Sequence, residues 1–281
     1  MLETKENILN DAKTIVASVQ TDAGCIRESN EDSGRHVTPS DLANHRSKGT
    51  LTIVADGMGG HASGEVASQM AVELISEYYY ADTGGDVADA LKAAIEAANS
   101  KIFEASASDE KYFGMGTTLV ALVVLDNTAI SAHVGDSRLY RMREGELELM
   151  TTDHSQVMEM VRHGIISLEQ ARDHDDKNVI LRAVGTQEHV EVEVSQPFQV
   201  DIGDTFLLCS DGLSDMVDDP TIESIMRSEP DIHVQGELLI AAAKENGGHD
   251  NITVGIVKID VSGVGETSSS VRVTREVEAF A

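Results

Sequence analysis

Residues 51–64 read LTIVADGMGGHASG. The five residues from Leu51 to Ala55 are apolar or β-branched, and such a run predicts a short buried strand. The run ends on Asp56, and the glycines that follow, beginning with Gly57, let other groups approach the backbone closely. The stretch therefore predicts a buried strand that carries a carboxylate to one edge of a sheet.

Three further aspartates stand beside predicted strands. ISAHVGDSR reaches Asp136, TFLLCSDG reaches Asp211, and Asp250 in GGHDN precedes the last strand. One acidic residue after a strand is usually a turn former, but several in glycine-containing turns need a shared explanation. Crowded carboxylates repel one another unless positive charge lies among them. Mg²⁺ and Mn²⁺ prefer oxygen ligands, so the aspartates predict a site for these ions, with Gly57 leaving room for them and offering its carbonyl.

The segment TDAGCIRESNEDS, residues 21–33, adds more groups of this kind. Glu31 and Asp32 are candidates to join the metal ligands or to orient them. Arg27 is either a salt-bridge partner of the acidic group or a phosphate-binding residue, because its planar guanidinium can bind phosphate with two hydrogen bonds. Metal ions together with one arginine are what hydrolysis of a phosphate ester requires.

The composition agrees with a cation as ligand. The 281 residues include 49 Asp and Glu against 21 Lys and Arg, for a formal net charge of -28. Such a surface should repel nucleic acid and anionic lipid, so we expect neither as a partner. Cys25 and Cys209 have no metal-ligand spacing, and no segment resembles a signal peptide or a membrane span. The expectation is a soluble cytoplasmic protein.

Short runs rich in Val, Ile, Leu and Thr predict the strands. They are Thr14–Gln20, Leu51–Ala55, Thr117–Leu125, Thr128–Val134, Asp204–Cys209 and Ile252–Val261. Tight hairpin turns are expected at Asp126–Asn127 and at Glu144–Gly145. Helical periodicity appears over residues 64–79 and 87–102, and Asp219 followed by Pro220 predicts the N-cap of a later helix.

We expect one domain over residues 1–261 and a flexible tail over 262–281. Residues 151–185 differ from their surroundings and read as an insertion beside the sheet edge, with Ser167 and Gln170 as a weak capping box. Five of its residues are open to two interpretations, substrate contact or ordinary surface. They are His154, His163, His174, Arg162 and Arg172.

Six motifs in order give the chain a family likeness: TDAGCIRESNEDS, VADGMGGH, GMGTTLVALVV, HVGDSRLY, LLCSDGLSD and GGHDNITV. The sequence resembles the metal-dependent Ser/Thr protein phosphatases of type 2C, the PPM family, in their compact bacterial form. The resemblance covers about residues 18–260. It implies an α+β fold, a four-layer α-β-β-α sandwich of two antiparallel sheets flanked by helix pairs, with a flap at about residues 151–185.

The resemblance also implies roles for individual residues. Asp56, Gly57, Asp211 and Asp250 match metal ligands, and Glu31 matches a ligand of the second ion, directly or through water. Asp136 matches the position that, with Asp211, holds a weaker third ion in bacterial members. Arg27 matches the phosphate-binding arginine, Asp32 matches a residue that orients water, and Asn251 matches a support of the ligand loop.

The implied reaction is hydrolysis of phosphoserine and phosphothreonine in proteins by a water nucleophile that bridges two Mn²⁺ or Mg²⁺ ions. The chain departs from members that carry DGH, because Met58 stands in the motif DGMGG. The general acid is therefore open between His61, close in sequence, and metal-bound water.

The resemblance also implies partners for the chain, and a second function is compatible with a metal-binding site. The implied partners are phosphorylated Ser/Thr proteins, including a Ser/Thr kinase and its substrates, or else a phosphorylated regulator of transcription. The alternative function is a catalytically silent metal-binding adaptor that recognises phosphoproteins. Because an adaptor has no need of a complete ligand set, the sequence favours the enzyme.

Overall fold

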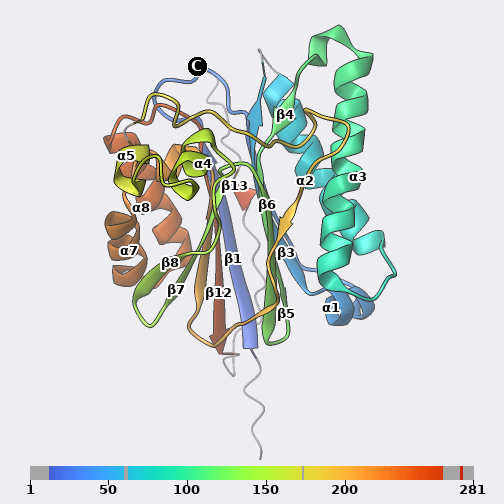
Figure 1. Ribbon diagram of the computed structural model, residues 1–281. Coiled ribbons are helices and arrows are strands. Elements are labelled where there is room, and N and C mark those ends of the chain that lie inside the picture. The colour runs from blue at the N-terminus through green and yellow to red at the C-terminus, as the bar shows by residue number, and fades with distance from the viewer. Residues whose placement is uncertain (1–12, 60–62, 173, 262–272, 275–281) are drawn as a thin grey trace, which may run out of the picture.

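Two β-sheets lie face to face in the centre of the computed structural model, and helices cover the outer face of each (Figure 1). The structure describes residues 13–59, 63–172, 174–261 and 273–274. The layers run helix, sheet, sheet, helix, which confirms the predicted α+β sandwich. Across these residues, no helix combines the length and the apolar content needed to cross a membrane.

The first sheet has the strand order β13-β1-β12-β11-β7-β8. Its strands are β1 (Lys13–Asp22), β7 (Arg138–Arg143), β8 (Glu146–Leu149), β11 (Thr205–Cys209), β12 (Ile252–Val261) and β13 (Val273–Thr274). All its pairs are antiparallel except β1 with the two-residue β13, which is parallel. Because Asp22 pairs with Ile252, the loop after β1 and the residues before β12 lie side by side.

The second sheet has the order β10-β6-β5-β3-β2. Its strands are β2 (Asp32–Val37), β3 (Thr50–Met58), β5 (Leu119–Leu125), β6 (Thr128–Val134) and β10 (Phe198–Gln199), with β4 (Gly116–Thr117) beside β3 and β9 (Glu193–Val194) beside β6. Every pair in it is antiparallel. The strand that begins at the opening motif, β3, therefore runs between β2 and β5 in the interior of the sheet.

Helices from two different parts of the chain cover the two sheets (Figure 1). On the second sheet lie α1 (Leu42–Lys48), α2 (Ser63–Ala81) and α3 (Val87–Ser108), followed by the short 3₁₀ helix η1 (Glu110–Tyr112). On the first sheet lie α6 (Asp211–Ser214), α7 (Asp219–Ser228) and α8 (Ile232–Glu245). The inserted segment, called the flap below (residues 151–185), contributes α4 (Gln156–Arg162) and α5 (Leu168–Arg172).

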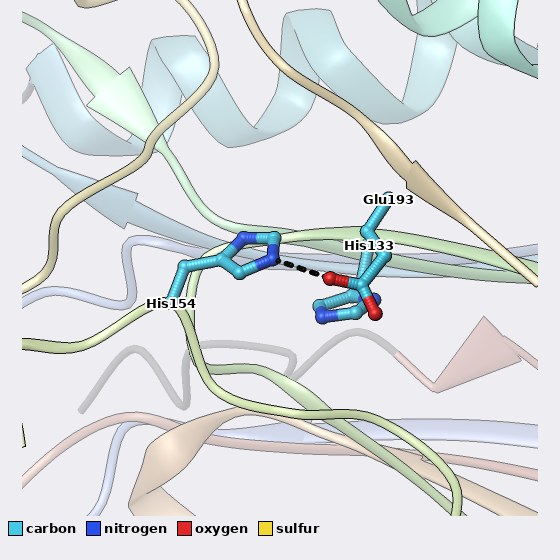
Figure 2. A group of neighbouring side chains, drawn as sticks. All are labelled: His133, His154 and Glu193. Atoms are coloured by element: carbon cyan, nitrogen blue, oxygen red, sulfur yellow. Dashed lines mark hydrogen bonds and ion pairs between the residues drawn. The ribbon is translucent and has the colours of Figure 1, made fainter. Parts of the chain in front are cut away.

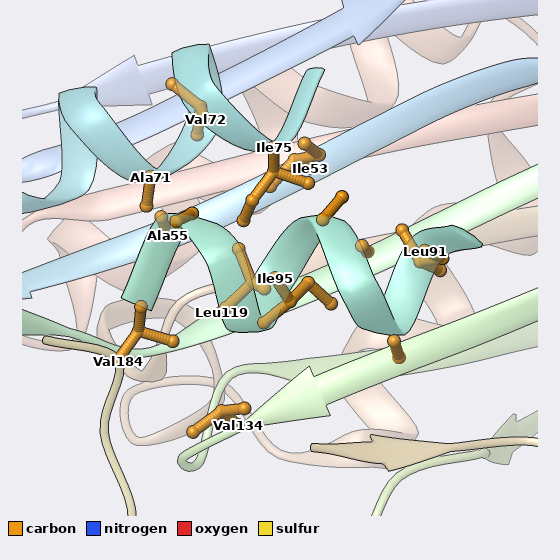
Figure 3. Close-up of a cluster of buried hydrophobic side chains, with 14 of the residues drawn as sticks. Ile53, Ala55, Ala71, Val72, Ile75, Leu91, Ile95, Leu119, Val134 and Val184 are labelled. Carbon is orange, nitrogen blue, oxygen red and sulfur yellow. The ribbon is translucent and has the colours of Figure 1, made fainter. Parts of the chain in front are cut away.

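Three apolar clusters fill the spaces between the four layers. The strand β3 contributes side chains to two of these clusters, because alternate side chains of a strand point to opposite faces of the sheet. Ile53 and Ala55 pack against α2 and α3, in the cluster that Figure 3 shows. Val54 points the other way, into the cluster between the sheets. This double burial explains why residues 51–55 form a continuous apolar run rather than an alternating one.

Both predicted hairpin turns are confirmed. The loop Asp126–Asn127 joins β5 to β6, and the loop Glu144–Gly145 joins β7 to β8. Asp126 and Glu144 each have a φ of 53°, the left-handed conformation that such two-residue loops require. The short loops fix the register of both strand pairs.

The predicted N-cap of α7 is wrong by one residue. Asp218, not Asp219, is the N-cap, and its side chain accepts the N–H of Thr221. Two adjacent aspartates have the same capping chemistry, and only the backbone path decides between them. In the flap, the capping box is confirmed: the Oγ of Ser167 accepts the N–H of Gln170 at 3.1 Å, and its own N–H donates to the Gln170 amide at 2.7 Å.

The predicted tail, residues 262–281, lies outside the described residues except for Val273–Thr274. These two residues pair with Val19 and Gln20 at the edge of β1. The division into one domain and a flexible tail stays a prediction.

Candidate metal centre

Five segments that are far apart in the sequence bring acidic residues to one edge of the sandwich. Asp56 lies near the end of β3, and Asp32 begins its partner β2. Asp211 follows β11 as the first residue of α6, and Asp136 lies in the turn between β6 and β7. Asp250 comes just before β12. Antiparallel pairing brings strand ends and strand starts to the same edge, so the predicted carboxylates gather there.

The carboxyl groups of Asp32, Asp56 and Asp211 are buried, and their charges influence one another's pKa. Burial raises the pKa of Asp32 to about 7, and the charge of Asp211 adds to this. Burial raises the pKa of Asp56 well above its ordinary value, with further contributions from both neighbours. Burial also raises the pKa of Asp211 to about 6, and the charges of Asp215 and Asp250 act in the same direction. Burial and neighbouring negative charge both favour protonated carboxyl groups here, and a bound cation would have the opposite effect.

Three carboxylate oxygens here are buried without a hydrogen-bond partner among the described residues: Oδ1 of Asp32, Oδ1 of Asp136 and Oδ1 of Asp211. Burial also raises the pKa of Asp136 well above its ordinary value. Buried polar atoms without partners are costly. A divalent cation would give these oxygens a partner and would favour their ionised form. The residues therefore fit Mg²⁺ or Mn²⁺.

The backbone at Gly57 is packed tightly rather than left open. A Cβ at this position would lie 2.2 Å from the carbonyl oxygen of Gly64 and 2.4 Å from that of Glu31. The N–H of Gly57 donates to the same Glu31 carbonyl at 3.1 Å. The glycine thus admits neighbouring backbone, which differs from the expectation that it makes room for ions, and it brings Glu31 beside the end of β3.

Asn251 fastens the loop between β1 and β2. Its Nδ2 donates to the carbonyl oxygens of Ala23 and Ser29, at 3.1 and 2.9 Å. Its Oδ1 accepts the N–H of Glu31 at 2.8 Å. The predicted supporting role of Asn251 therefore has a direct geometric basis, since three bonds from one amide fix both ends of the loop.

Arg27 lies in that loop and contacts the aspartate group from outside. Its Nη2 donates to Oδ2 of Asp250 at 2.6 Å, and this hydrogen bond raises the pKa of the guanidinium. The Arg27 side chain is 51% exposed. It therefore stands where a ligand from solvent would meet the carboxylates.

Comparison with known proteins shows the family of the chain. The family model described as Protein phosphatase 2C matches residues 29–233 of the chain. This chain belongs to the protein phosphatase 2C family. The serine/threonine phosphatase stp of Listeria monocytogenes is 40% identical over 258 residues, which cover 90% of this chain and 99% of that protein.

Solved structures of related phosphatases share the fold. The crystal structure of the Mycobacterium tuberculosis serine/threonine phosphatase PstP/Ppp is similar with a TM-score of 0.78 at 37% identity, over 88% of this chain and 99% of that one. The catalytic domain of PstP in complex with two manganese ions is similar with a TM-score of 0.75 at 35% identity, over 89% of this chain and 100% of that one. A metal-dependent family member of this fold thus holds two manganese ions.

Three hydroxyl residues that the sequence analysis did not single out support the aspartates of this phosphatase 2C chain. The Oγ of Ser210 donates to Oδ2 of Asp32 at 2.7 Å and accepts a backbone N–H of β12 at 3.0 Å. The Oγ1 of Thr118 accepts the N–H of Asp56 at 3.2 Å and shares a hydrogen bond with Ser137 at 2.7 Å. The available signal is that each hydroxyl stands within a quoted motif, in CSDG, GTT and GDSR.

The flap lies beside the aspartates. A cavity of about 490 Å³ between the flap and residues 211–219 has Asp136 and Asp211 among its lining residues. Arg172 and Lys177 of the flap also line it. Each is paired with an aspartate of residues 211–219, at 3.3 and 2.7 Å. The cavity therefore connects the candidate metal centre to flap side chains.

The other flap residues considered for substrate contact differ in how exposed they are. His154 is buried, whereas His163 and Arg162 are exposed and each pairs with a glutamate of α4, at 3.6 and 2.6 Å. His174 is half-buried. His61, the candidate general acid, lies outside the described residues.

Proposed function

We propose that this chain hydrolyses phosphoserine and phosphothreonine in proteins, using divalent cations held by Asp56 and its neighbouring aspartates. The strongest support is the set of three buried carboxylate oxygens for which the described residues offer no partner, beside a half-exposed arginine. Such a group needs cations, and cations with an arginine suit a phosphate ester. The chain is an enzyme of the protein serine/threonine phosphatase class, as its family and its relatives' names indicate.

The proposed ligands of two ions are the carboxylates of Asp56, Asp211, Asp250 and Glu31 and the carbonyl oxygen of Gly57. We assign a weaker third ion to Asp136 together with Asp211. Both Mn²⁺ and Mg²⁺ accept this set of oxygens. When bound, the ions would supply positive charge that favours ionisation of a water molecule and offsets charge on the phosphoryl oxygens.

Arg27 is proposed to bind the substrate phosphate. Among the described residues only its Nη2 reaches Asp250, so the other donors of the planar guanidinium face a ligand from solvent. Two parallel N–H groups match two phosphate oxygens, which fixes the orientation of the ester as well as its charge.

Asp32 is proposed to orient the attacking water. Ser210 fixes its Oδ2, while its buried Oδ1 has no partner among the described residues. An oxygen held in place with an unused lone pair is suited to accept a hydrogen bond from water and align it with phosphorus. We assign protonation of the leaving alkoxide to His61 or to water.

The partners are proposed to be phosphorylated proteins, including a Ser/Thr kinase and its substrates, in cytoplasmic signalling. Residues 1–261 would form the catalytic domain and residues 262–281 a flexible extension. The flap cavity is where residues flanking the phosphorylated side chain would bind, because its lining includes both Asp136 and Asp211 and residues of α5.

The test is hydrolysis of p-nitrophenyl phosphate and of a phosphothreonine peptide with Mn²⁺, with Mg²⁺ and with EDTA. We expect turnover with metal and none with EDTA. A folded protein that binds Mn²⁺ without turning over either substrate would instead support the silent adaptor.

A further inference from the structure

A second group of polar side chains lies at the base of the flap. It consists of His133 on β6, His154 at the start of the flap and Glu193 on β9 (Figure 2). The two imidazole rings are stacked, with centroids 4.5 Å apart and planes at 18°. Nε2 of His154 lies 3.1 Å from the Glu193 carboxylate. Two histidines and a glutamate at this spacing have the composition of a metal site.

The hydrogen bonds around His154 argue against a metal ion. Its Nδ1 lies 3.2 Å from the N–H of Gly135, which can only donate, so Nδ1 must be the acceptor. In a neutral imidazole the proton is then on Nε2, which donates to Glu193 and has no lone pair for a cation. Burial lowers the pKa of His154, which favours the neutral ring. Nη1 of Arg182, also a donor, lies farther from Nε2, at 3.4 Å against 3.1 Å for Glu193, so we assign the hydrogen bond to Glu193 and count the guanidinium as positive charge that disfavours a cation.

His154 instead holds the turn that carries Asp136. Besides the bond to Nδ1, the backbone N–H of His154 donates to the carbonyl oxygen of Gly135 at 2.8 Å. One residue thus satisfies both backbone groups of Gly135. Gly135 has a φ of 105°, and a Cβ there would lie 2.7 Å from the Thr118 side chain, so this turn has little freedom to relax.

The same residue joins the two ends of the flap. The carbonyl oxygen of His154 accepts the N–H of Leu181 at 2.8 Å, and the adjacent Ser155 forms a β-bridge with Ile180. The ring beneath it is also fixed, because Nε2 of His133 bonds to the carbonyl oxygen of Thr152 at 2.9 Å. The base of the flap and the turn before Asp136 therefore meet at one residue, His154, whose backbone bonds both and whose Nδ1 adds a side-chain bond to Gly135.

We propose that His154 is a positioning residue that couples the base of the flap to the Gly135–Asp136 turn, and thereby sets how strongly the Asp136 side of the centre binds its cation. The inference rests on the proposed function, which assigns Asp136 to the weaker ion. A shift of the flap would move Gly135 through His154, and so would move the adjacent carboxylate.

Two substitutions separate the functions of the ring nitrogens. In His154→Asn the amide oxygen takes roughly the place of Nδ1 and can still accept from Gly135. In His154→Gln the amide nitrogen takes roughly the place of Nε2 and can still donate to Glu193, but the acceptor for Gly135 is lost. His163→Asn, on the exposed part of the flap, is the matched control.

Each variant is compared with the unmodified protein by two measurements, and thermal melts confirm that it is folded. The first is Mn²⁺ binding by calorimetry together with the Mn²⁺ concentration that gives half-maximal turnover. The second is amide hydrogen exchange of peptides containing Gly135 and Leu181. We expect His154→Gln to weaken the lower-affinity Mn²⁺ step about three- to tenfold, as for loss of a buried hydrogen-bond acceptor, and to speed exchange at Gly135. His154→Asn and His163→Asn should stay close to the unmodified protein.

Two results would overturn the coupling. One is a folded His154→Gln protein with unchanged Mn²⁺ binding and unchanged exchange at Gly135. The other is equal loss in the Asn and Gln variants, which would mean that the ring only fills space. Failure of the proposed function is distinguishable, because it would appear as absence of turnover in the unmodified protein with every metal.

Discussion

Asp32 and Asp56 face each other as direct register partners on β2 and β3, where two ionised side chains would repel. Burial adds to this cost and raises the pKa of both groups, that of Asp32 to about 7. The pairing of these strands is therefore unfavourable at neutral pH unless a cation lies between the carboxylates. We therefore expect a divalent cation bound at this centre to stabilise the fold as well.

Without metal, we expect the protein to lose stability as the pH rises from about 4 to about 7. The ordinary pKa of an aspartate is 3.8, and folding raises it to about 7 at Asp32 and about 6 at Asp211. The folded state then binds these protons more tightly than the unfolded chain, so the stabilisation is complete below the ordinary value and is lost through the raised values. Melting temperatures in EDTA across this range measure it, and excess Mn²⁺ should raise them most at the upper end.

Asp32→Asn isolates this effect from the other titrating groups. Its side chain cannot ionise, so its melting temperature in EDTA should fall less with rising pH than that of the unmodified protein. Identical pH profiles for the two proteins would contradict a raised pKa at Asp32.

Asp211→Asn should abolish metal-dependent turnover. A neutral amide attracts a cation less than a carboxylate does, and loss of an outer-shell partner alone can cost up to about 100-fold. Turnover of p-nitrophenyl phosphate and calorimetric Mn²⁺ binding should both collapse. Asp201→Asn, at a 69% exposed side chain, is the control. Unchanged turnover in Asp211→Asn would remove this residue from the centre.

Arg27→Ala should weaken phosphate binding while leaving Mn²⁺ affinity nearly intact. The guanidinium is half exposed and, within the described part of the chain, bonds to the acidic group through Asp250, so its removal should take away the proposed phosphate contacts rather than metal ligands. The expected result is a higher KM for the phosphothreonine peptide and weaker inhibition by inorganic phosphate. Equal losses of phosphate and Mn²⁺ binding would show that the arginine is structural.

The sequence predicted the aspartates because each stands at a strand end, a position visible in a single run of letters. It did not predict β2, whose sequence DSGRHV has no apolar alternation. This strand buries His36, which is satisfied by a bond of 2.8 Å to Thr52 on the neighbouring strand. Thr52 is distant from His36 in sequence. The same is true of Asp32, which Ser210 contacts, and of Asp56, which Thr118 contacts. The quoted motifs contain Ser210 and Thr118, but no local pattern indicates which distant residue each one contacts.

Ser210→Ala should slow turnover about three- to tenfold without preventing metal binding. The hydroxyl holds Oδ2 of Asp32 at 2.7 Å, and a lost hydrogen bond to a charged group is worth about 1.5–3 kcal/mol, of which water can restore a part. The measurement is kcat at saturating Mn²⁺. Ser210→Thr keeps the hydroxyl and should recover part of the rate, whereas a rate in the alanine variant equal to the unmodified one would show that Asp32 needs no support.

Removing the residues after Gly263 should leave activity on p-nitrophenyl phosphate intact. Among the described residues the removed segment contributes only two pairings, Val273 with Val19 and Thr274 with Gln20, at the edge of β1. A segment at one end of a chain that is tied by a short edge pairing tolerates truncation. The melting temperature should fall by less than about 4 °C, the shift that 1 kcal/mol produces in a domain of this size. A large loss of turnover would show instead that the segment belongs to the catalytic fold, with β13 as a required edge of the first sheet.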